Sequence, residues 1–129
     1  MLDIAQKQRD LALKANAKPN QRIGGLFPLI CQKEWMMQAM WNVLRNRGAE
    51  TAGTDGKIKA MYYDGKTRSL NANAIKRVEE VCQSLASGSY RPQPARRIYI
   101  PKANGKMRPI GISTLDDRMV CHGFWFLII

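Results

Sequence analysis

The stretch from Arg96 to Ile112 limits the fold more than any other part of the chain, because isoleucines alternate with other residues on both sides of an Asn-Gly pair. A period-two pattern interrupted by a glycine turn is typical of a β-hairpin. We expect one strand from Arg97 to Lys102 and a second from Lys106 to Ile112, joined through residues 103–105. The fold therefore contains at least one antiparallel pair of strands.

The length of the connection decides which isoleucines share a face of this hairpin. A two-residue turn at Asn104 and Gly105 would put one pair of isoleucines on each face. A three-residue connection, with Gly105 left-handed at a bulge, puts all four on one face. We predict the three-residue connection, because it allows a single apolar face to turn towards the domain interior. The four residues are Ile98, Ile100, Ile110 and Ile112.

The same register places three cations, Lys102, Lys106 and Arg108, beyond the isoleucines at the hairpin tip. Ammonium groups supply point charges and a guanidinium group supplies a planar fork, so this tip suits phosphate oxygens. The chemistry alone leaves open whether the phosphate belongs to a nucleotide triphosphate or to a strand backbone. A charged end that only prevents edge-to-edge strand pairing is a further alternative.

The distribution of charge also favours an anionic partner. The 129 residues include 21 Lys and Arg against 10 Asp and Glu, a formal net charge of +11. No acidic residue lies between Val81 and Leu115, a stretch that contains Arg91, Arg96, Arg97, Lys102, Lys106 and Arg108. Such a block favours nucleic acid as the partner, and the alternative is a solvated face that only maintains solubility. Tyr90 and Tyr99, near Arg96 and Arg97, are candidates either for base stacking or for packing.

Helical patterns account for much of the remaining chain. Met1 to Lys18 is rich in Ala, Leu, Lys and Gln, and Pro19 ends it. Lys33 to Asn46 repeats apolar residues at helical spacing and is followed by Gly48 as its expected C-cap, and Asn73 to Ala86 shows the same spacing. The glycine-rich stretch after Gly48 reads as a structured loop. We therefore expect an α+β fold in which a small helical N-terminal region packs with the hairpin.

Residue types and spacing argue against several other kinds of site. Cys31, Cys82 and Cys121 show no CxxC pairing and have only His122 beside them, so we interpret them as free thiols in a reducing cytosol. Residues 65–67 imitate the end of a P-loop, but Ala60 stands where that motif requires glycine. No apolar run approaches the roughly 20 residues of a membrane span, and nothing marks the chain for export. We expect no membrane partner.

Two longer motifs are specific enough to suggest a family. Within Gln21 to Gly56, a helix ends in Asn-x-Gly-Ala-x-Thr-x-Gly-x-Asp-Gly. Within Tyr90 to Val120 the order is Arg-Arg-x-x-Ile-Pro-Lys, then Gly-Lys-x-Arg-Pro-x-Gly-Ile, then Asp-Arg. Together these segments resemble the N-terminal and fingers region of group II intron-encoded reverse transcriptases, also called maturases. We accordingly divide the chain into a mobile N-terminal helix (1–20), a fingers domain (21–120) and an atypical apolar tail (121–129).

The resemblance implies partners and roles for particular residues. It implies that Lys102 and Arg108 hold the triphosphate of the incoming nucleotide. It also implies template RNA and structured intron RNA as partners, and a cytoplasmic location of bacterial or organellar type. The residues that we assign to RNA contact are Arg45, Arg47, Arg96, Arg97 and Lys106.

The resemblance implies no catalytic role for this chain. Polymerisation in the family needs palm carboxylates that hold two Mg²⁺ ions, and the sequence shows neither the palm Asp strand nor the Tyr-x-Asp-Asp hairpin. We therefore assign it no catalytic residue, no metal ligand and no cofactor. Asp116 and Asp117 align with the Asp-Arg element, where we expect a structural role through Arg118. Cys121 to Ile129 does not resemble the amphipathic helix expected there, which suggests a truncated or frame-shifted reading frame.

Two classes of function stay open at this point. The chain is either the remnant of an enzyme that keeps its binding surface without its palm, or a free-standing RNA-binding or interaction module. The apolar tail favours the first class, because it fits neither a finished domain end nor a helix cap.

We predict that the purified chain does not extend a DNA primer on an RNA template in the presence of Mg²⁺ and nucleotides, because it carries no palm carboxylates. A primer-extension assay on protein free of other polymerases checks this. Template-dependent extension would overturn the prediction.

Overall fold

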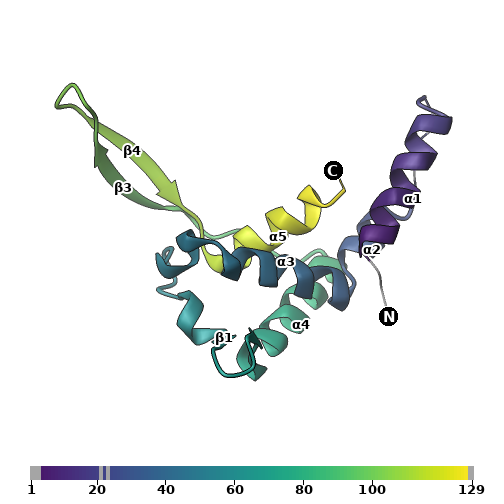
Figure 1. The fold of residues 1–129 in the computed structure, drawn as a ribbon, viewed down its shortest axis with the longest axis horizontal. Coiled ribbons are helices and arrows are strands. Elements are labelled where there is room, and N and C mark those ends of the chain that lie inside the picture. Colours follow the sequence, from purple (N-terminus) through teal and green to yellow (C-terminus); the bar gives the residue numbers. More distant parts are fainter. Residues whose placement is uncertain (1–3, 21, 23, 128–129) are drawn as a thin grey trace.

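The body of the protein is a cluster of helices, and a long hairpin projects from it, as the computed structural model shows (Figure 1). The structure describes residues 4–20, 22 and 24–127. The α-helices are α1 (Ile4–Ala17), α2 (Leu26–Ile30), α3 (Lys33–Arg45), α4 (Ala72–Ser87) and α5 (Leu115–Trp125). Two 3-10 turns, η1 (Arg47–Glu50) and η2 (Lys59–Met61), follow α3. The strands form two separate hairpins, β1 (Tyr63–Asp64) with β2 (Ser69–Leu70) and β3 (Arg96–Pro101) with β4 (Met107–Ile112).

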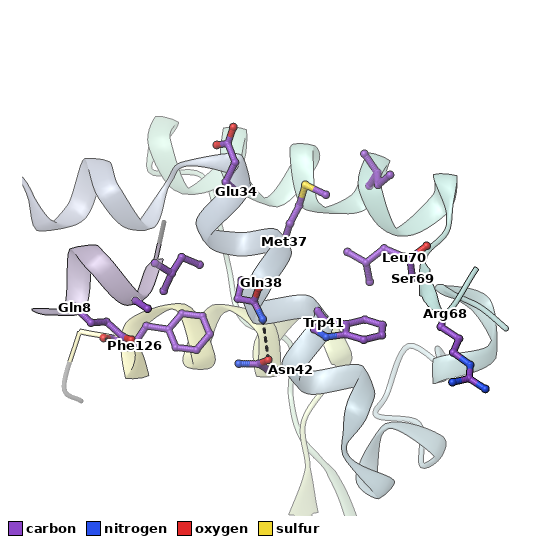
Figure 2. A pocket seen from close by; sticks show the side chains of 13 residues that line it. Gln8, Glu34, Met37, Gln38, Trp41, Asn42, Arg68, Ser69, Leu70 and Phe126 are labelled. Carbon is purple, nitrogen blue, oxygen red and sulfur yellow. Dashed lines mark hydrogen bonds between the residues drawn. The ribbon is translucent and has the colours of Figure 1, made fainter. Parts of the chain in front are cut away.

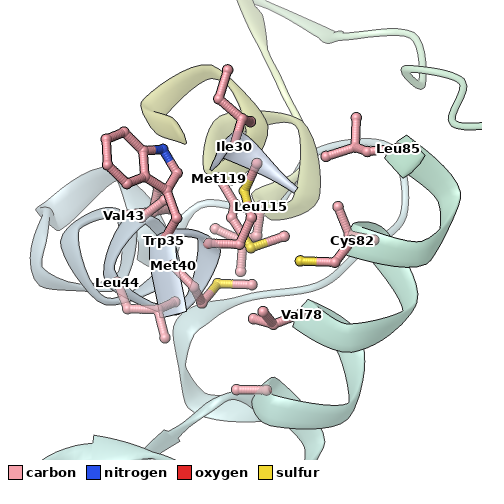
Figure 3. Packing of buried hydrophobic residues seen from close by; sticks show 14 of the residues in the cluster. Ile30, Trp35, Met40, Val43, Leu44, Val78, Cys82, Leu85, Leu115 and Met119 are labelled. Atoms are coloured by element: carbon pink, nitrogen blue, oxygen red, sulfur yellow. The ribbon is translucent and has the colours of Figure 1, made fainter. Parts of the chain in front are cut away.

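Helix α3 lies at the centre of the core and packs against both α4 and α5. Its two apolar rows are buried along their whole length, which confirms the helix predicted from their spacing. These rows are Trp35, Ala39 and Val43, and Met36, Met40 and Leu44. Figure 3 shows side chains of these rows meeting Val78 and Cys82 from α4 and Leu115 and Met119 from α5. One hydrophobic core therefore joins segments that lie far apart in the sequence.

A buried hydrogen bond fixes how α3 meets α5. The indole Nε1 of Trp35 donates to the carbonyl oxygen of Gly123 at 2.8 Å, and the Trp35 side chain is fully buried. Gly123 is itself buried, and a Cβ there would lie 2.8 Å from Cε of Met36. The absence of a side chain at Gly123 thus allows α5 to approach α3 closely, and the approach brings the carbonyl to the indole.

Helix α4 is capped at both ends. The side chain of Asn71 accepts a hydrogen bond from the backbone N–H of Ala74, which satisfies one of the free amides of the first turn. At the other end Gly88 is left-handed with φ of 75°, and the helix ends at Ser87, one residue beyond the predicted Ala86. By contrast, the prediction of Gly48 as the C-cap of α3 is wrong. Asn46 is the C-cap in extended conformation, and Gly48 lies inside the following 3-10 turn.

The N-terminal helix exists as predicted, and α1 ends at Ala17, before Pro19. Residues 1–3 of the predicted helix lie outside the described residues. Helix α1 contributes no buried residue, although Ile4 and Leu11 are partly buried against the core. A hydrogen bond of 2.9 Å from Gln8 Nε2 to the carbonyl of Phe126 joins it to the end of α5. The short helix α2 and the small β1–β2 hairpin were not predicted.

The register of the long hairpin is confirmed. Ile98 pairs with Ile110, Ile100 with Arg108, and Arg96 with Ile112, so all four isoleucines share one face. Gly105 has φ of 81°, and Lys102 donates its backbone N–H to the carbonyl of Lys106 at 2.7 Å across the three-residue connection. The parity argument was sufficient because the side-chain direction alternates strictly along a strand.

The expectation that these isoleucines face the domain interior is wrong. None of them is buried, and Ile100 is 37% exposed. The hairpin extends away from the helices (Figure 1), and the buried core includes no described residue of β3 or β4. A shared apolar face shows which residues lie together, but it does not show that another element of the same chain covers them.

The boundary that the sequence suggested at residue 120 falls within α5 (Leu115–Trp125). Helix α5 continues to Trp125, and Gly123 and Phe126 are buried in the core. The ring of Phe126 packs edge-on against Trp35, with centroids 5.7 Å apart. Residues 121–126 are therefore part of the helical body, while Phe124 and Trp125 remain about half exposed on the outer face of α5.

Each helix within the described part of the chain is too short or too polar to cross a lipid bilayer.

We predict that Trp35→Phe lowers the free energy of unfolding by about 1–3 kcal/mol, because it removes the indole donor and leaves the buried Gly123 carbonyl without that partner. Trp125→Phe is the matched control, since Trp125 is half exposed, and it should change stability by less than about 0.5 kcal/mol. Urea unfolding of the three proteins measures both values. Equal effects of the two substitutions would contradict the role of the indole bond.

Candidate nucleic-acid interface

The loop of residues 48–56 joins the hairpin to the helical body, and Arg118 of α5 is its main anchor. The Arg118 guanidinium donates to the carbonyl of Ser113 through Nε at 2.9 Å and through Nη2 at 2.7 Å. It also donates to the carbonyls of Gly48 at 2.8 Å and Thr51 at 2.9 Å. One side chain thus holds the loop after α3 against the junction between β4 and α5.

Gly53 brings the same loop into direct backbone contact with that junction. A Cβ on Gly53 would lie 2.7 Å from the backbone nitrogen of Thr114 and 2.8 Å from the carbonyl carbon of Ser113. These distances are shorter than van der Waals contact, so only glycine fits at this position. The glycine of the Thr-x-Gly-x-Asp-Gly motif therefore has a steric explanation.

The loop holds the first strand of the hairpin as well as the second. Arg96 donates from Nε to the carbonyl of Ala52 at 2.9 Å, and the hydroxyl of Thr54 donates to the carbonyl of Pro94 at 3.0 Å. An isolated two-stranded hairpin is at best marginally stable in water. These contacts at both strands explain how the projecting hairpin keeps a defined base.

Arg118 keeps its charge although it is partly buried. Burial lowers the pKa of its guanidinium, and the Asp55 carboxylate acts in the opposite direction. Asp55 accepts the backbone N–H of Lys57 at 3.0 Å through Oδ1, while its buried Oδ2 has no hydrogen-bond partner among the described residues. Because arginine stays protonated in proteins, Asp55 supplies compensating charge to the anchor.

Asp116 and Asp117 have structural contacts, but not through Arg118 as predicted, since Arg118 contacts carbonyl oxygens instead. Asp116 is buried, and its Oδ2 accepts a hydrogen bond from Nε of Arg77 and forms an ion pair with Nη2, each at 2.8 Å. This contact is the main cause of the raised pKa of Arg77. Asp117 accepts the hydroxyl of Tyr90 and, at 2.9 Å, the backbone N–H of Gln93. The two carboxylates diverge towards α4 and towards the segment before β3, and this arrangement does not fit a shared metal site.

Tyr90 is therefore a packing residue in this structure. Burial, and then its hydrogen bond to Asp117, raise the pKa of its hydroxyl. Tyr99 differs, because its side chain is 56% exposed on the strand. Of the two tyrosines considered for base stacking, only Tyr99 presents a free ring.

The three cations of the tip lie as the register predicted. Arg108 is opposite Ile100, and Lys102 is opposite Lys106, so all three belong to the isoleucine face. They are exposed, and within the described chain their side chains make no hydrogen bond or ion pair. Lys102, Lys106 and Arg108 together form the tip group. Its charges are available to an external anion.

The other basic residues assigned to RNA do not form one surface with the tip group. Arg96 shares the isoleucine face but lies at the base, where its Nε is already bound to Ala52. Arg97 lies on the opposite face with Tyr99 and the exposed Met107. At about 3.4 Å per residue, Arg96 at the base is roughly 14 Å from Arg108 and roughly 20 Å from Lys102 and Lys106.

Arg45 and Arg47 lie with the base of the hairpin. They are exposed at the end of α3 and the start of η1, beside the Gly48 carbonyl that Arg118 binds. The five predicted RNA contacts are thus divided among the tip, the base and the opposite face. Strand alternation separates Lys106, Arg96 and Arg97, but the place of Arg45 and Arg47 beside the base depends on where the hairpin leaves the body.

Comparison with known proteins identifies relatives that are much longer than this chain. No known protein-family model matches it. It is 44% identical over 117 residues to Protein YkfC of Escherichia coli (strain K12), across 91% of this chain and 29% of that protein. It is 39% identical over 96 residues to Group II intron-encoded protein LtrA of Lactococcus lactis subsp. cremoris, across 74% of this chain and 14% of LtrA. LtrA of strain MG1363 aligns with the same values. The chain therefore spans less than a third of the length of these relatives.

We predict that Gly53→Ala destabilises the protein by about 1–3 kcal/mol, because the added methyl group overlaps backbone atoms of residues 113 and 114 that cannot rotate away. Gly65→Ala is the control, since no atom lies within 4 Å of the position that its added methyl group would take. Chemical unfolding measures both. A Gly53→Ala protein as stable as the Gly65→Ala protein would show that the loop does not pack on the hairpin base.

Proposed function

We propose that this chain is the fingers part of a group II intron reverse transcriptase or maturase-related protein, and that its hairpin binds RNA and nucleotide. The partial homology to LtrA supports a fragment related to such proteins. The observation that carries the binding role is the tip group, three unpaired cations on one face of a projecting hairpin in the described part of the chain.

The electrostatic setting strengthens this interpretation of the tip group. No acidic residue occurs from residue 82 to residue 114, so no carboxylate from the hairpin itself neutralises the three charges. Elsewhere in the structure, cations such as Lys33 and Arg77 are paired with carboxylates. Exposed cations that have no local counter-ion bind polyanions and release the counterions of the polyanion.

The tip group divides into two proposed roles. Lys102 and Arg108 would hold the triphosphate of a nucleotide, since an ammonium group and a guanidinium fork on the same face can contact different phosphate oxygens. Lys106, together with the base residues Arg45, Arg47, Arg96 and Arg97, would contact RNA. The free ring of Tyr99 on the Arg97 face is available for stacking on a base.

Catalysis is not part of this proposal. The candidate carboxylates Asp116 and Asp117 are held by Arg77 and Tyr90, so they do not fit the Mg²⁺ site that polymerisation requires. The chain would position RNA and nucleotide for chemistry carried out by other residues.

We predict that Lys102→Ala with Arg108→Ala weakens the binding of a nucleoside triphosphate by about tenfold or more, on the order expected for losing two charged contacts. Arg97→Ala with Lys106→Ala is the matched control, because it removes the same charge from the same hairpin. That control should instead weaken the binding of single-stranded RNA. The slope of the logarithm of the RNA binding constant against the logarithm of the salt concentration should become shallower by about 1.4. Titrations with each ligand at several salt concentrations measure all four effects.

The pattern of the two double variants decides between the roles. Equal loss of both ligands in the Lys102 and Arg108 variant would mean that the tip contacts a strand backbone rather than a triphosphate. Unchanged binding of both ligands in both variants would refute the hairpin as the binding element.

A further inference from the structure

A groove of about 990 Å³ lies on the side of α3 that faces away from the core, and neither the family resemblance nor the proposed hairpin site accounts for it. Its walls come from α1, α3, α4, the end of α5 and the β1–β2 hairpin (Figure 2). Apolar side chains, among them Met37, Trp41, Leu70 and Phe126, form most of its lining. A cavity of this size is large enough for a ligand with several ring atoms.

Trp41 gives the groove an aromatic wall, and its indole is stacked on Tyr63, which lies outside the lining. The half-buried ring of Trp41 stacks on Tyr63, with centroids 5.9 Å apart and an angle of 22° between the planes. The ammonium group of Lys59 lies 4.7 Å from the centroid of Tyr63 and adds positive charge to the stack. Trp41 lines the groove, so its indole is in reach of a flat ligand.

Beside the indole lies a pair of amides with free hydrogen-bonding capacity. Gln38 donates from Nε2 to Oδ1 of Asn42 at 3.1 Å, which fixes the orientation of both groups (Figure 2). Within the described residues, this leaves the acceptor Oε1 of Gln38 and the donor Nδ2 of Asn42 without another partner. An acceptor next to a donor is the arrangement that contacts the edge of a nucleobase.

Charged side chains of opposite sign line different parts of the groove. Arg68 lines one end of the groove, and its side chain is exposed and forms no ion pair among the described residues. Its backbone is in the left-handed region, with φ of 52°. Glu34 lines the groove at a distance from Arg68 (Figure 2). Trp41 lies between Arg68 and the pair of Gln38 and Asn42 in the same view. An anionic group is therefore favoured beside Arg68 and disfavoured beside Glu34.

We propose that this groove binds one unpaired base of single-stranded RNA. The base stacks on Trp41, its edge contacts Gln38 and Asn42, and the adjoining phosphate contacts Arg68. This inference rests on the proposed RNA-binding function, but it concerns a site that is distinct from the hairpin. A purely apolar peptide would use Trp41 and Leu70 and would leave the free amides and Arg68 without partners, so the polar groups favour a nucleotide.

Tryptophan fluorescence of the whole chain tests the proposal, because stacking of a base on an indole quenches its emission. The probes are an eight-nucleotide single-stranded RNA, the same RNA with one abasic position, and adenosine monophosphate. Trp41→Phe shows whether Trp41 is the tryptophan whose emission falls on binding. Trp125→Phe is the control, because Trp125 is half exposed on the outer face of α5. Trp41→Leu removes the aromatic face, and Arg68→Ala is compared with Lys14→Ala on α1.

We expect RNA to quench the wild-type protein and Trp125→Phe but not Trp41→Phe. Trp41→Leu should bind the RNA at least about fivefold more weakly, the lower end of the effect of one stacked base. The abasic position should weaken binding to the wild type but not to Trp41→Leu, since the two changes remove the same contact. Arg68→Ala should weaken binding more than Lys14→Ala does.

The remaining outcomes separate the groove from the hairpin. If RNA quenched Trp41→Phe as much as the wild type, the base would not stack on Trp41. If the abasic position weakened binding equally in the wild type and in Trp41→Leu, the same would follow. Either result would overturn the groove site and leave the proposed hairpin function intact. Quenching by adenosine monophosphate through Trp41 without RNA binding would support the groove as a nucleotide site and refute the RNA function. No quenching by any probe would refute the groove. Self-association that Trp41→Leu abolishes, without a quench by RNA, would assign the groove to a second copy of the chain and overturn the proposal.

Discussion

The contact between Arg118 and three backbone carbonyls holds the base of the long hairpin and the loop after α3 against the helical body. Ser113 lies five residues before Arg118, whereas Gly48 and Thr51 lie 70 and 67 residues before it. Arg118 therefore joins two segments that are far apart in the sequence. The carbonyl of Gly48 also accepts the backbone N–H of Thr51 at 3.1 Å, so Arg118 gives that carbonyl a second donor. The planar guanidinium contacts all three carbonyls at once, whereas an ammonium group has no fixed fork of donors.

Local patterns in the sequence were enough for α3, α4 and the β3–β4 hairpin, but not for α2, α5 or the β1–β2 hairpin. The spacing of Trp35 to Leu44 predicted α3 and its buried rows, and the parity of the isoleucines around Gly105 predicted the strand register. Both predictions use geometry that repeats along one element. The position of that element relative to the others is not part of such a pattern, which is why the isoleucine face was wrongly expected to be internal.

The candidate sites show the same limit. The tip group could be assembled from the sequence because its members lie within one hairpin, on strands whose pairing the turn determines. The groove could not, because Trp41 and Gln38 come from α3, whereas Arg68 comes from the unpredicted β1–β2 hairpin. Tyr90 illustrates the reverse case: its position before the basic strand left base stacking and packing both open, and a carboxylate 27 residues later binds its hydroxyl. Only the packing of α5 beside that segment shows that its ring is not free.

The anchoring of the hairpin at one end makes it a lever arm. Its base is held by the loop of residues 48–56, and over its remaining length the described chain provides no buried contact. For an arm of roughly 20 Å, a rotation of about 10° at the base moves the far end by about 3.5 Å, which exceeds the length of a hydrogen bond. Substitutions at the pivot can therefore displace the terminal cations without altering them, so loss of binding alone does not identify a residue as a ligand contact.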